Sequence, residues 1–163
     1  MALKFFISHA SEDIEKIQPL LDLIKSQGNI DMFLAEHSIS PGENFEKRIL
    51  REIESSDLLI LFYSKNAEKS HYVINEIGAA KGKGKGKDII PILLDDAKPK
   101  GMLSYVNYVD LSSPDSYPNE IKRLEDFLKK SLRRDAIGNA IVIGGLIWLF
   151  VWFLNQKGTT ASG

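Results

Sequence analysis

The chain has 163 residues, of which 44% are hydrophobic, and it carries a net charge of −1 and no cysteine. This length and apolar content suit one globular domain, and the near-neutral charge excludes a general attraction to nucleic acid. The lack of cysteine excludes disulfides and thiolate metal sites, in keeping with a reducing cytoplasmic environment. The three histidines, His9, His37 and His71, have no metal-ligand spacing. We therefore expect neither a metal nor a nucleic-acid partner.

Short apolar runs alternate with longer stretches of helical spacing along the chain. Ser11 is expected to be the N-cap of the first helix, and Gly28 is expected to end it. The run 58–63 is apolar throughout, which predicts a strand buried on both faces. Strands are predicted at residues 3–7, 30–34, 58–63, 89–94 and 106–109, and helices at about 11–24, 43–55, 72–81 and 118–134.

This alternation predicts an α/β fold, with a flavodoxin-like five-stranded parallel sheet and helices on both faces, because parallel neighbours need crossover connections. Ligands of such sheets bind beyond the carboxyl ends of the strands. The segments to inspect are therefore 8–10, 35–42, 64–72 and 95–100. They contain no glycine-rich dinucleotide fingerprint and no P-loop, and the Lys/Gly run at 81–87 also lacks the P-loop pattern.

Residues 136–154 carry no charge over 19 positions and follow a basic run at 129–134. A helix of this length spans about 28 Å, close to the hydrocarbon thickness of a bilayer. The sequence predicts a transmembrane helix at 135–155, a cytoplasmic domain at 1–134 and a short disordered tail at 156–163, with the orientation set by the basic flank. The alternative is a buried C-terminal helix, which would need apolar partners on every side. The anchor would either tether the domain or itself act on the membrane.

Three segments resemble motifs of Toll/interleukin-1 receptor (TIR) domains. Residues 5–13, FFISHASED, resemble the first TIR box, and residues 34–42, LAEHSISPG, resemble the BB loop. Residues 70–80, SHYVINEIGAA, resemble the S-x-W-x-x-x-E-x-x-x-A stretch whose glutamate is catalytic in TIR domains that cleave NAD⁺. The resemblance covers residues 1–134 and implies the TIR fold.

The resemblance implies that Glu76 is the catalytic residue. Its carboxylate would stabilise the oxocarbenium-like ribosyl group, and the cationic nicotinamide leaves without a general acid, unlike the leaving group of an ordinary glycoside. Tyr72 precedes Glu76 by four residues, so it would share the same helix face and wall the pocket. Without the motif at residues 70–80, Glu76 would be interpreted as an ordinary exposed residue of a helix. The implied substrate-binding residues are His9, Phe6, Ser8, Glu36, Ser38, Gly42 and Tyr72.

Departures from the family pattern, among them a missing acidic residue near Ala35, suggest weak or partner-dependent activity. The usual tryptophan is Tyr72 here, and Ala10 offers no basic contact to phosphate. His9 has a competing structural interpretation, because it could equally cap the following helix or be exposed. Phe5 and Phe6 alternate across a strand, so at least one of them belongs to the core.

Two function classes follow. The first is a membrane-anchored TIR NAD⁺ nucleosidase, with NAD⁺ as substrate and no cofactor, which yields nicotinamide and ADP-ribose or a cyclic ADP-ribose, in antiviral defence signalling. It would form a homo-oligomer through TIR–TIR contacts and touch membrane lipids. The alternative is a non-enzymatic TIR adaptor that signals by assembly at the membrane. The third interpretation is a flavodoxin-like or receiver-like module. It ranks last because this sequence lacks a convincing acidic cluster for phosphorylation.

Overall fold

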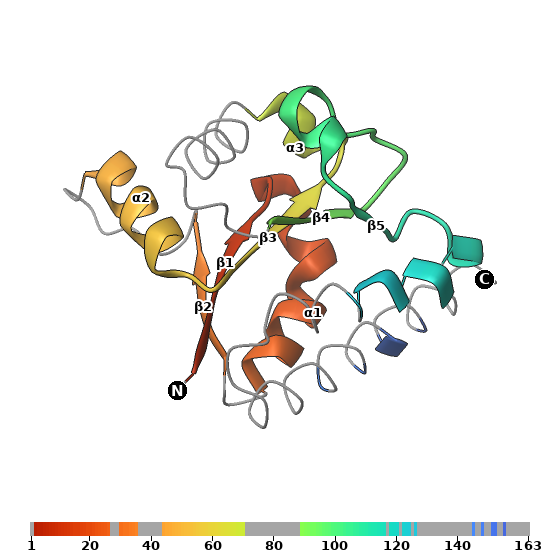
Figure 1. The fold of residues 1–163 in the computed structure, drawn as a ribbon, viewed down its shortest axis with the longest axis horizontal. Helices are drawn as coiled ribbons and strands as arrows, with labels where there is room; N and C mark the ends of the chain where they lie inside the picture. Colours follow the sequence, from red (N-terminus) through yellow and green to blue (C-terminus); the bar gives the residue numbers. More distant parts are fainter. Residues whose placement is uncertain are drawn as a thin grey trace.

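The structure is a computed structural model of the chain. It describes residues 2–26, 30–35, 44–70, 89–116, 118–120 and 122–124, together with single positions 126, 145, 148, 151, 152 and 155. These residues include a complete central sheet and the helices on its two faces (Figure 1).

The sheet has five parallel strands in the order β2-β1-β3-β4-β5. β3 is the central strand, and β1 lies between β2 and β3 and pairs with β3 from Phe5↔Leu58 to Ser8↔Leu61. The predicted parallel five-stranded sheet is thus confirmed. The strands are β1 (Leu3–Ser8), β2 (Ile30–Leu34), β3 (Leu58–Tyr63), β4 (Ile89–Leu93) and β5 (Val109–Asp110).

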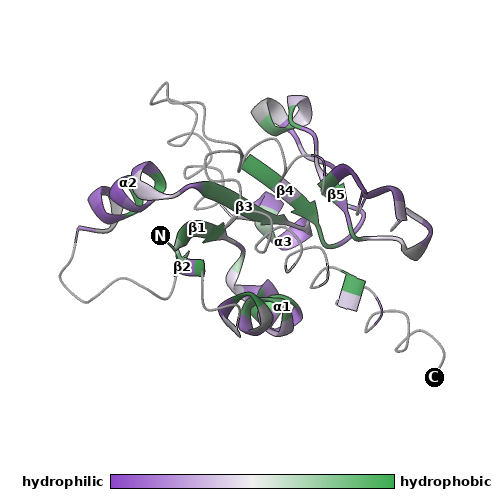
Figure 2. Ribbon diagram, turned by 60° about the horizontal axis from the view of Figure 1, so that its bottom comes forward, coloured by the Kyte–Doolittle hydropathy of each residue, from purple (hydrophilic) through white to green (hydrophobic). Residues whose placement is uncertain are grey.

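Helices cover both faces of the sheet, with α1 on one side and α2 on the other (Figure 2). Residues 118–120 and 122–124 are also helical, as predicted for the region after the last strand. The α-helices are α1 (Ile14–Ser26), α2 (Phe45–Ser55) and α3 (Lys65–Lys69), and three 3-10 turns lie at η1 (Ser11–Asp13), η2 (Gly101–Tyr105) and η3 (Pro114–Ser116).

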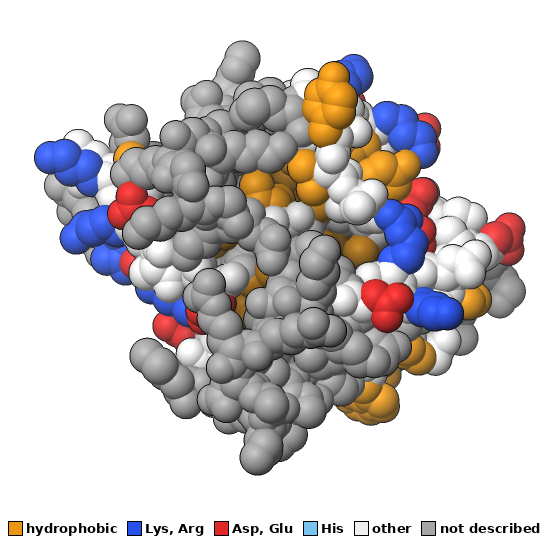
Figure 3. All heavy atoms as spheres, in the orientation of Figure 1, with side chains coloured by type: hydrophobic (Ala, Val, Ile, Leu, Met, Phe, Trp, Pro, Cys, Tyr) orange, Lys and Arg blue, Asp and Glu red, His pale blue; other side chains and the backbone are white. Residues whose placement is uncertain are grey.

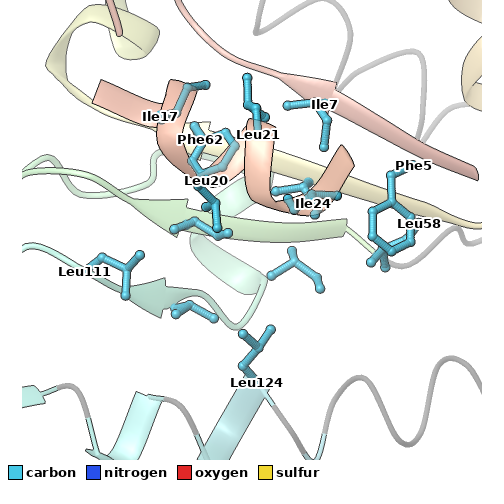
Figure 4. Close-up of a cluster of buried hydrophobic side chains, with 14 of the residues drawn as sticks. Phe5, Ile7, Ile17, Leu20, Leu21, Ile24, Leu58, Phe62, Leu111 and Leu124 are labelled. Carbon is cyan, nitrogen blue, oxygen red and sulfur yellow. The ribbon is translucent and has the colours of Figure 1, made fainter. Parts of the chain in front are cut away.

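The core divides into two clusters because successive side chains of a strand point to opposite faces. In β3, Leu58, Ile60 and Phe62 belong to one cluster, and Leu59 and Leu61 to the other. The α1-side cluster includes Ile17, Leu20, Leu21 and Ile24 of α1, together with Leu111 and Leu124 (Figure 4). The α2-side cluster includes Phe6, Phe33, Ile49, Ile53, Tyr63 and Ala67. The strand at 58–63 is buried on both faces, as its composition predicts.

The local structure differs from the sequence predictions at three places. Ser11 is not an N-cap: it lies inside η1, which Ala10 precedes without a side-chain cap, and the amide of Asp13 donates to the Ala10 carbonyl at 2.9 Å. The short helix α3 was not predicted. β5 is limited to two residues, because the amide of Val106 donates to Leu103 instead of joining the ladder.

Several predicted elements lie outside the described residues. These are the helix at 72–81, the loop at 36–43, Gly28, and most of residues 127–163. Among the described residues, no helix combines the length and the apolarity that crossing a membrane would require. The transmembrane helix at 135–155 and the domain limits drawn around it therefore stay predictions.

Candidate functional site

The carboxyl ends of β1 and β3 lie side by side where the strand order reverses, and an α/β fold offers its ligand site at this point. Ser8 ends this strand and is 5% exposed, and His9, the next residue, is 1% exposed. The amide of Ala35, directly after β2, donates to the Ile7 carbonyl at 3.3 Å. The segment that resembles the BB loop therefore leaves the sheet beside the end of β1. A ligand could reach the His9 ring only after the groups that cover it move.

A buried carboxylate lies next to this strand end. Asp13 is 0% exposed, and its Oδ1 accepts from Asn66 Nδ2 at 2.8 Å and from Lys16 Nζ at 3.2 Å. Its Oδ2 accepts a hydrogen bond from the hydroxyl of Ser64. Burial of an ionised carboxylate is tolerated when donors and a positive charge surround it. Asp13 thus joins the segment after β1 to the segment after β3.

Ser64 has a second role as the N-cap of α3. Its Oγ accepts from the amides of Asn66 at 3.1 Å and Ala67 at 3.0 Å. These are amides that the first turn of a helix leaves unsatisfied. The same hydroxyl therefore fixes the start of α3 and its link to Asp13. α3 in turn ends at the residue before Ser70, whose amide donates to Ala67 at 3.1 Å.

The segment after β4 is bound to α3 by charged groups. The amide of Lys65 donates to Asp95 Oδ2 at 3.1 Å, and Lys65 Nζ lies 2.6 Å from Asp96 Oδ1. The hydrogen bond to Asp96 raises the pKa of Lys65, and Lys65 lowers the pKa of Asp96. Lys100 pairs with Glu68, which raises the pKa of Lys100. Positive and negative side chains also stand side by side on the face shown in Figure 3.

Tyr63, the last residue of β3, contacts the segment after β4. Its side chain belongs to the α2-side cluster, and its hydroxyl donates to the Lys98 carbonyl at 3.5 Å. Burial raises the pKa of Tyr63, and the negative charge of Glu68 raises it further. The raised pKa favours the neutral phenol, whose hydrogen bond links β3 to the loop after β4.

The predicted site residues fall into three groups: two lie at the end of β1, one lies in the core, and five lie outside the described residues. Ser8 and His9 lie together at the end of β1, whereas Phe6 points into the α2-side cluster, where its ring stacks on Phe33 with centroids 5.6 Å apart. The burial of Phe6, which is 1% exposed, favours a role in the core. The other predicted residues, Glu36, Ser38, Gly42, Tyr72 and Glu76, lie outside the described residues.

Sequence reasoning did not find the network of Asp13, Ser64 and Asn66. From the sequence alone, Asp13 is an ordinary acidic residue in the first turn of a helix, since helix N-termini favour acidic residues. A clearer signal was Ser64, because a serine directly after a wholly apolar strand is typical of an N-cap. Its pairing with Asp13 joins positions 51 residues apart and has no local signature.

A family model described as "TIR domain" matches residues 5–125. The chain belongs to the TIR domain family. The match begins within β1 and extends through the helical residues at 122–124, so it includes most of β1 and all of β2 to β5. Among curated proteins, none matches this chain.

Solved TIR structures share the fold. The TIR domain of the Toll-related receptor TRR-2 from Hydra magnipapillata is 24% identical, with a TM-score of 0.63, and the match covers 76% of this chain and 95% of that one. The TIR domains of the activated Roq1 resistosome, which recognises the pathogen effector XopQ, are 14% identical, with a TM-score of 0.53, over 98% of this chain and 99% of that one. At these identities the likeness establishes the TIR fold alone.

Proposed function

We propose that this TIR domain is an NAD⁺ nucleosidase that breaks the bond between nicotinamide and ribose, with Glu76 as the catalytic carboxylate. The observation that carries the proposal is the place of the glutamate motif after α3. The motif begins at Ser70, and Ser64 and Asn66 bind the start of α3 to Asp13 beside the end of β1. Six residues span at most about 22 Å, a length that allows Glu76 to reach the carboxyl edge of the sheet.

The chemistry needs only one carboxylate. Nicotinamide in NAD⁺ is already cationic, so it departs without a proton from a general acid, and the developing oxocarbenium charge is what the enzyme must stabilise. Glu76 supplies that negative charge, and water or the adenine then takes the ribosyl group, which gives ADP-ribose or its cyclic form. Tyr72 and His9 would hold the nicotinamide ring, and Ser8, Glu36, Ser38 and Gly42 would shape the cleft.

Assembly and a membrane complete the proposal. Homo-oligomers would form through TIR–TIR contacts, in which the segment 35–42 of one copy completes the cleft of another. The uncharged run 136–154 would hold the domain on the cytoplasmic side of a membrane. Such tethering raises the effective concentration of the copies and so favours assembly. We place this activity in antiviral defence signalling.

The test is nicotinamide release from NAD⁺ by the full-length protein in mild detergent at high concentration. Wild type should release nicotinamide, and Glu76→Gln should lose at least about 100-fold in rate, because the charge that stabilises the transition state is gone. Glu15→Gln is the matched control. Glu15 is exposed on α1, so the same change of charge there should leave the rate unaltered.

Each outcome decides between the two function classes. Release by wild type and Glu15→Gln, but not by Glu76→Gln, supports the nucleosidase. If Glu76→Gln and wild type release nicotinamide equally, Glu76 is not the catalytic residue. If the wild-type protein at high concentration releases no nicotinamide, the proposal fails, and the alternative of a non-enzymatic adaptor is favoured.

A further inference from the structure

Trp152, far beyond the last strand, packs against the α1-side cluster. The described positions 145, 148, 151, 152 and 155 all have helical backbone. Because the cluster that Trp152 contacts includes the apolar side chains of α1, Trp152 lies on the α1 side of the sheet. A residue from the segment predicted to cross a membrane therefore contacts the core of the TIR domain.

Among the described positions between 145 and 155, the exposed fraction of a residue varies with its position on the helical wheel. On a helical wheel of about 100° per residue, Gly145 and Trp152 lie within about 20° of each other, and both are partly buried. Trp148 and Val151 lie about 40° and about 100° to one side of Trp152, and they are 60% and 37% exposed. Asn155, between these two on the wheel, is exposed as well. Among these five described positions, Gly145 and Trp152, which are neighbours on the wheel, are thus less exposed than the three toward Val151.

We propose that the C-terminal apolar segment is an intramolecular ligand of its own TIR domain. In the chain away from a bilayer, the side that carries Gly145 and Trp152 lies on the α1-side cluster and shields part of the segment from water. The occupant of this surface is therefore the same chain and not a second protein. This docking does not depend on whether the domain cleaves NAD⁺.

The burial of Trp152 explains why such docking would be favourable. Tryptophan removes more apolar surface from water than any other side chain, and the gain grows with the area buried. The remaining apolar side, with Trp148 and Val151, stays exposed to solvent. Docking therefore covers only part of the segment, and the exposed side remains available for other contacts.

The chain contains only two tryptophans, so each can be observed alone. In the full-length protein without detergent or lipid, Trp148→Phe leaves Trp152 as the fluorophore, and Trp152→Phe leaves Trp148. Docking predicts that Trp152 emits at shorter wavelength than Trp148 and that acrylamide quenches it severalfold less. The measurement is repeated over a range of protein dilutions, to separate intramolecular shielding from shielding by a second copy.

A stability measurement gives an independent readout. Because Trp152 packs on the core cluster whereas Trp148 is 60% exposed, Trp152→Ala should lower the melting temperature of the domain by on the order of 4 °C, and Trp148→Ala should leave it unchanged. Equal quenching of the two tryptophans, equal melting temperatures of the two alanine variants, or shielding of Trp152 that disappears on dilution would each overturn the proposal. The third result would assign the surface to a second copy.

Discussion

The hydroxyl of Ser64 donates to the carboxylate of Asp13, and both side chains are completely buried, although 51 residues separate them. Ser64 is the N-cap of α3, and Asp13 is the last residue of η1, the 3-10 turn that follows β1. This hydrogen bond joins the segment after β1 to the segment after β3, at the edge of the sheet where the NAD⁺ site is proposed. Its removal should therefore affect both the fold and the position of the segment that contains Glu76.

Ser64→Ala should lower the free energy of unfolding by about 2–4 kcal/mol, because α3 loses its cap and a buried carboxylate loses a donor. Urea unfolding of the full-length protein, followed by circular dichroism, measures this loss. Ser112→Ala is the control. Its hydroxyl donates to Asp110 Oδ1 at 2.5 Å but is exposed, so its loss should stay within about 0.5 kcal/mol. Equal losses in the two variants would show that the buried pair contributes nothing beyond an exposed one.

Asn66→Asp should make stability depend on pH. The amide of Asn66 lies 2.8 Å from Asp13 Oδ1, so the change places two carboxyls in contact. Their repulsion raises the pKa of the introduced carboxyl in the folded state, so the folded state binds the proton more tightly than the unfolded one. Stability is then present at low pH and is lost as the pH rises through that pKa.

Urea midpoints at about pH 4.5 and about pH 7.5, on either side of the range in which such a shifted carboxyl titrates, measure this effect. The deficit of Asn66→Asp relative to wild type should be larger at the higher pH. Asn66→Ala removes the donor without adding a charge, so its deficit should be similar at both. A deficit of Asn66→Asp that does not change with pH would contradict direct contact with Asp13.

Phe6→Leu should destabilise the protein by about 1–2 kcal/mol, because the α2-side cluster loses the stacked pair with Phe33. The KM for NAD⁺ should not change, since the ring of Phe6 is 1% exposed. Urea unfolding and steady-state kinetics on the same preparation separate the two effects. A raised KM at unchanged stability would instead assign Phe6 the substrate contact that the sequence resemblance implies.

Tyr63→Phe should reduce the loss of stability at alkaline pH. Burial, together with Glu68, raises the pKa of Tyr63 in the folded protein, so the folded state retains the phenol proton more tightly than the unfolded state. The resulting stability is present below the unfolded pKa of about 10 and is lost as the pH rises through the folded value. The comparison is between urea midpoints at neutral and strongly alkaline pH. Tyr105→Phe, at a side chain that is 92% exposed, serves as the control, and an equal effect there would rule out burial as the cause.

The proposed anchor is tested by flotation with vesicles of phosphatidylcholine and phosphatidylglycerol. The full-length chain should float with the vesicles, because 19 uncharged residues can enter the hydrocarbon region. A chain that ends at Arg134 should remain at the bottom of the gradient. If the two chains distribute alike, residues 136–154 do not anchor the protein, whatever they contact on the TIR domain.

The sequence by itself determined the sheet and most of its helices. The apolar run at 58–63 predicted a strand buried on both faces, and the periodicity after Ser11 predicted the helix that covers one of them. These predictions succeed because burial imposes a local repeat of two or 3.6 residues on the chain. The motif around Glu76 likewise indicated the TIR family, which the family match to residues 5–125 confirms.

Only the tertiary structure decided the contacts between distant segments. The helix α3 is five residues long and begins where Ser64 caps it and meets Asp13, and Trp152 packs on a cluster formed by residues more than 25 positions away. The contact of Ser64 with Asp13 and the packing of Trp152 have no local signature, since each depends on side chains that folding brings together. Hydrogen bonds and apolar contacts of this kind gain their strength from shared burial, which no single segment of the sequence determines.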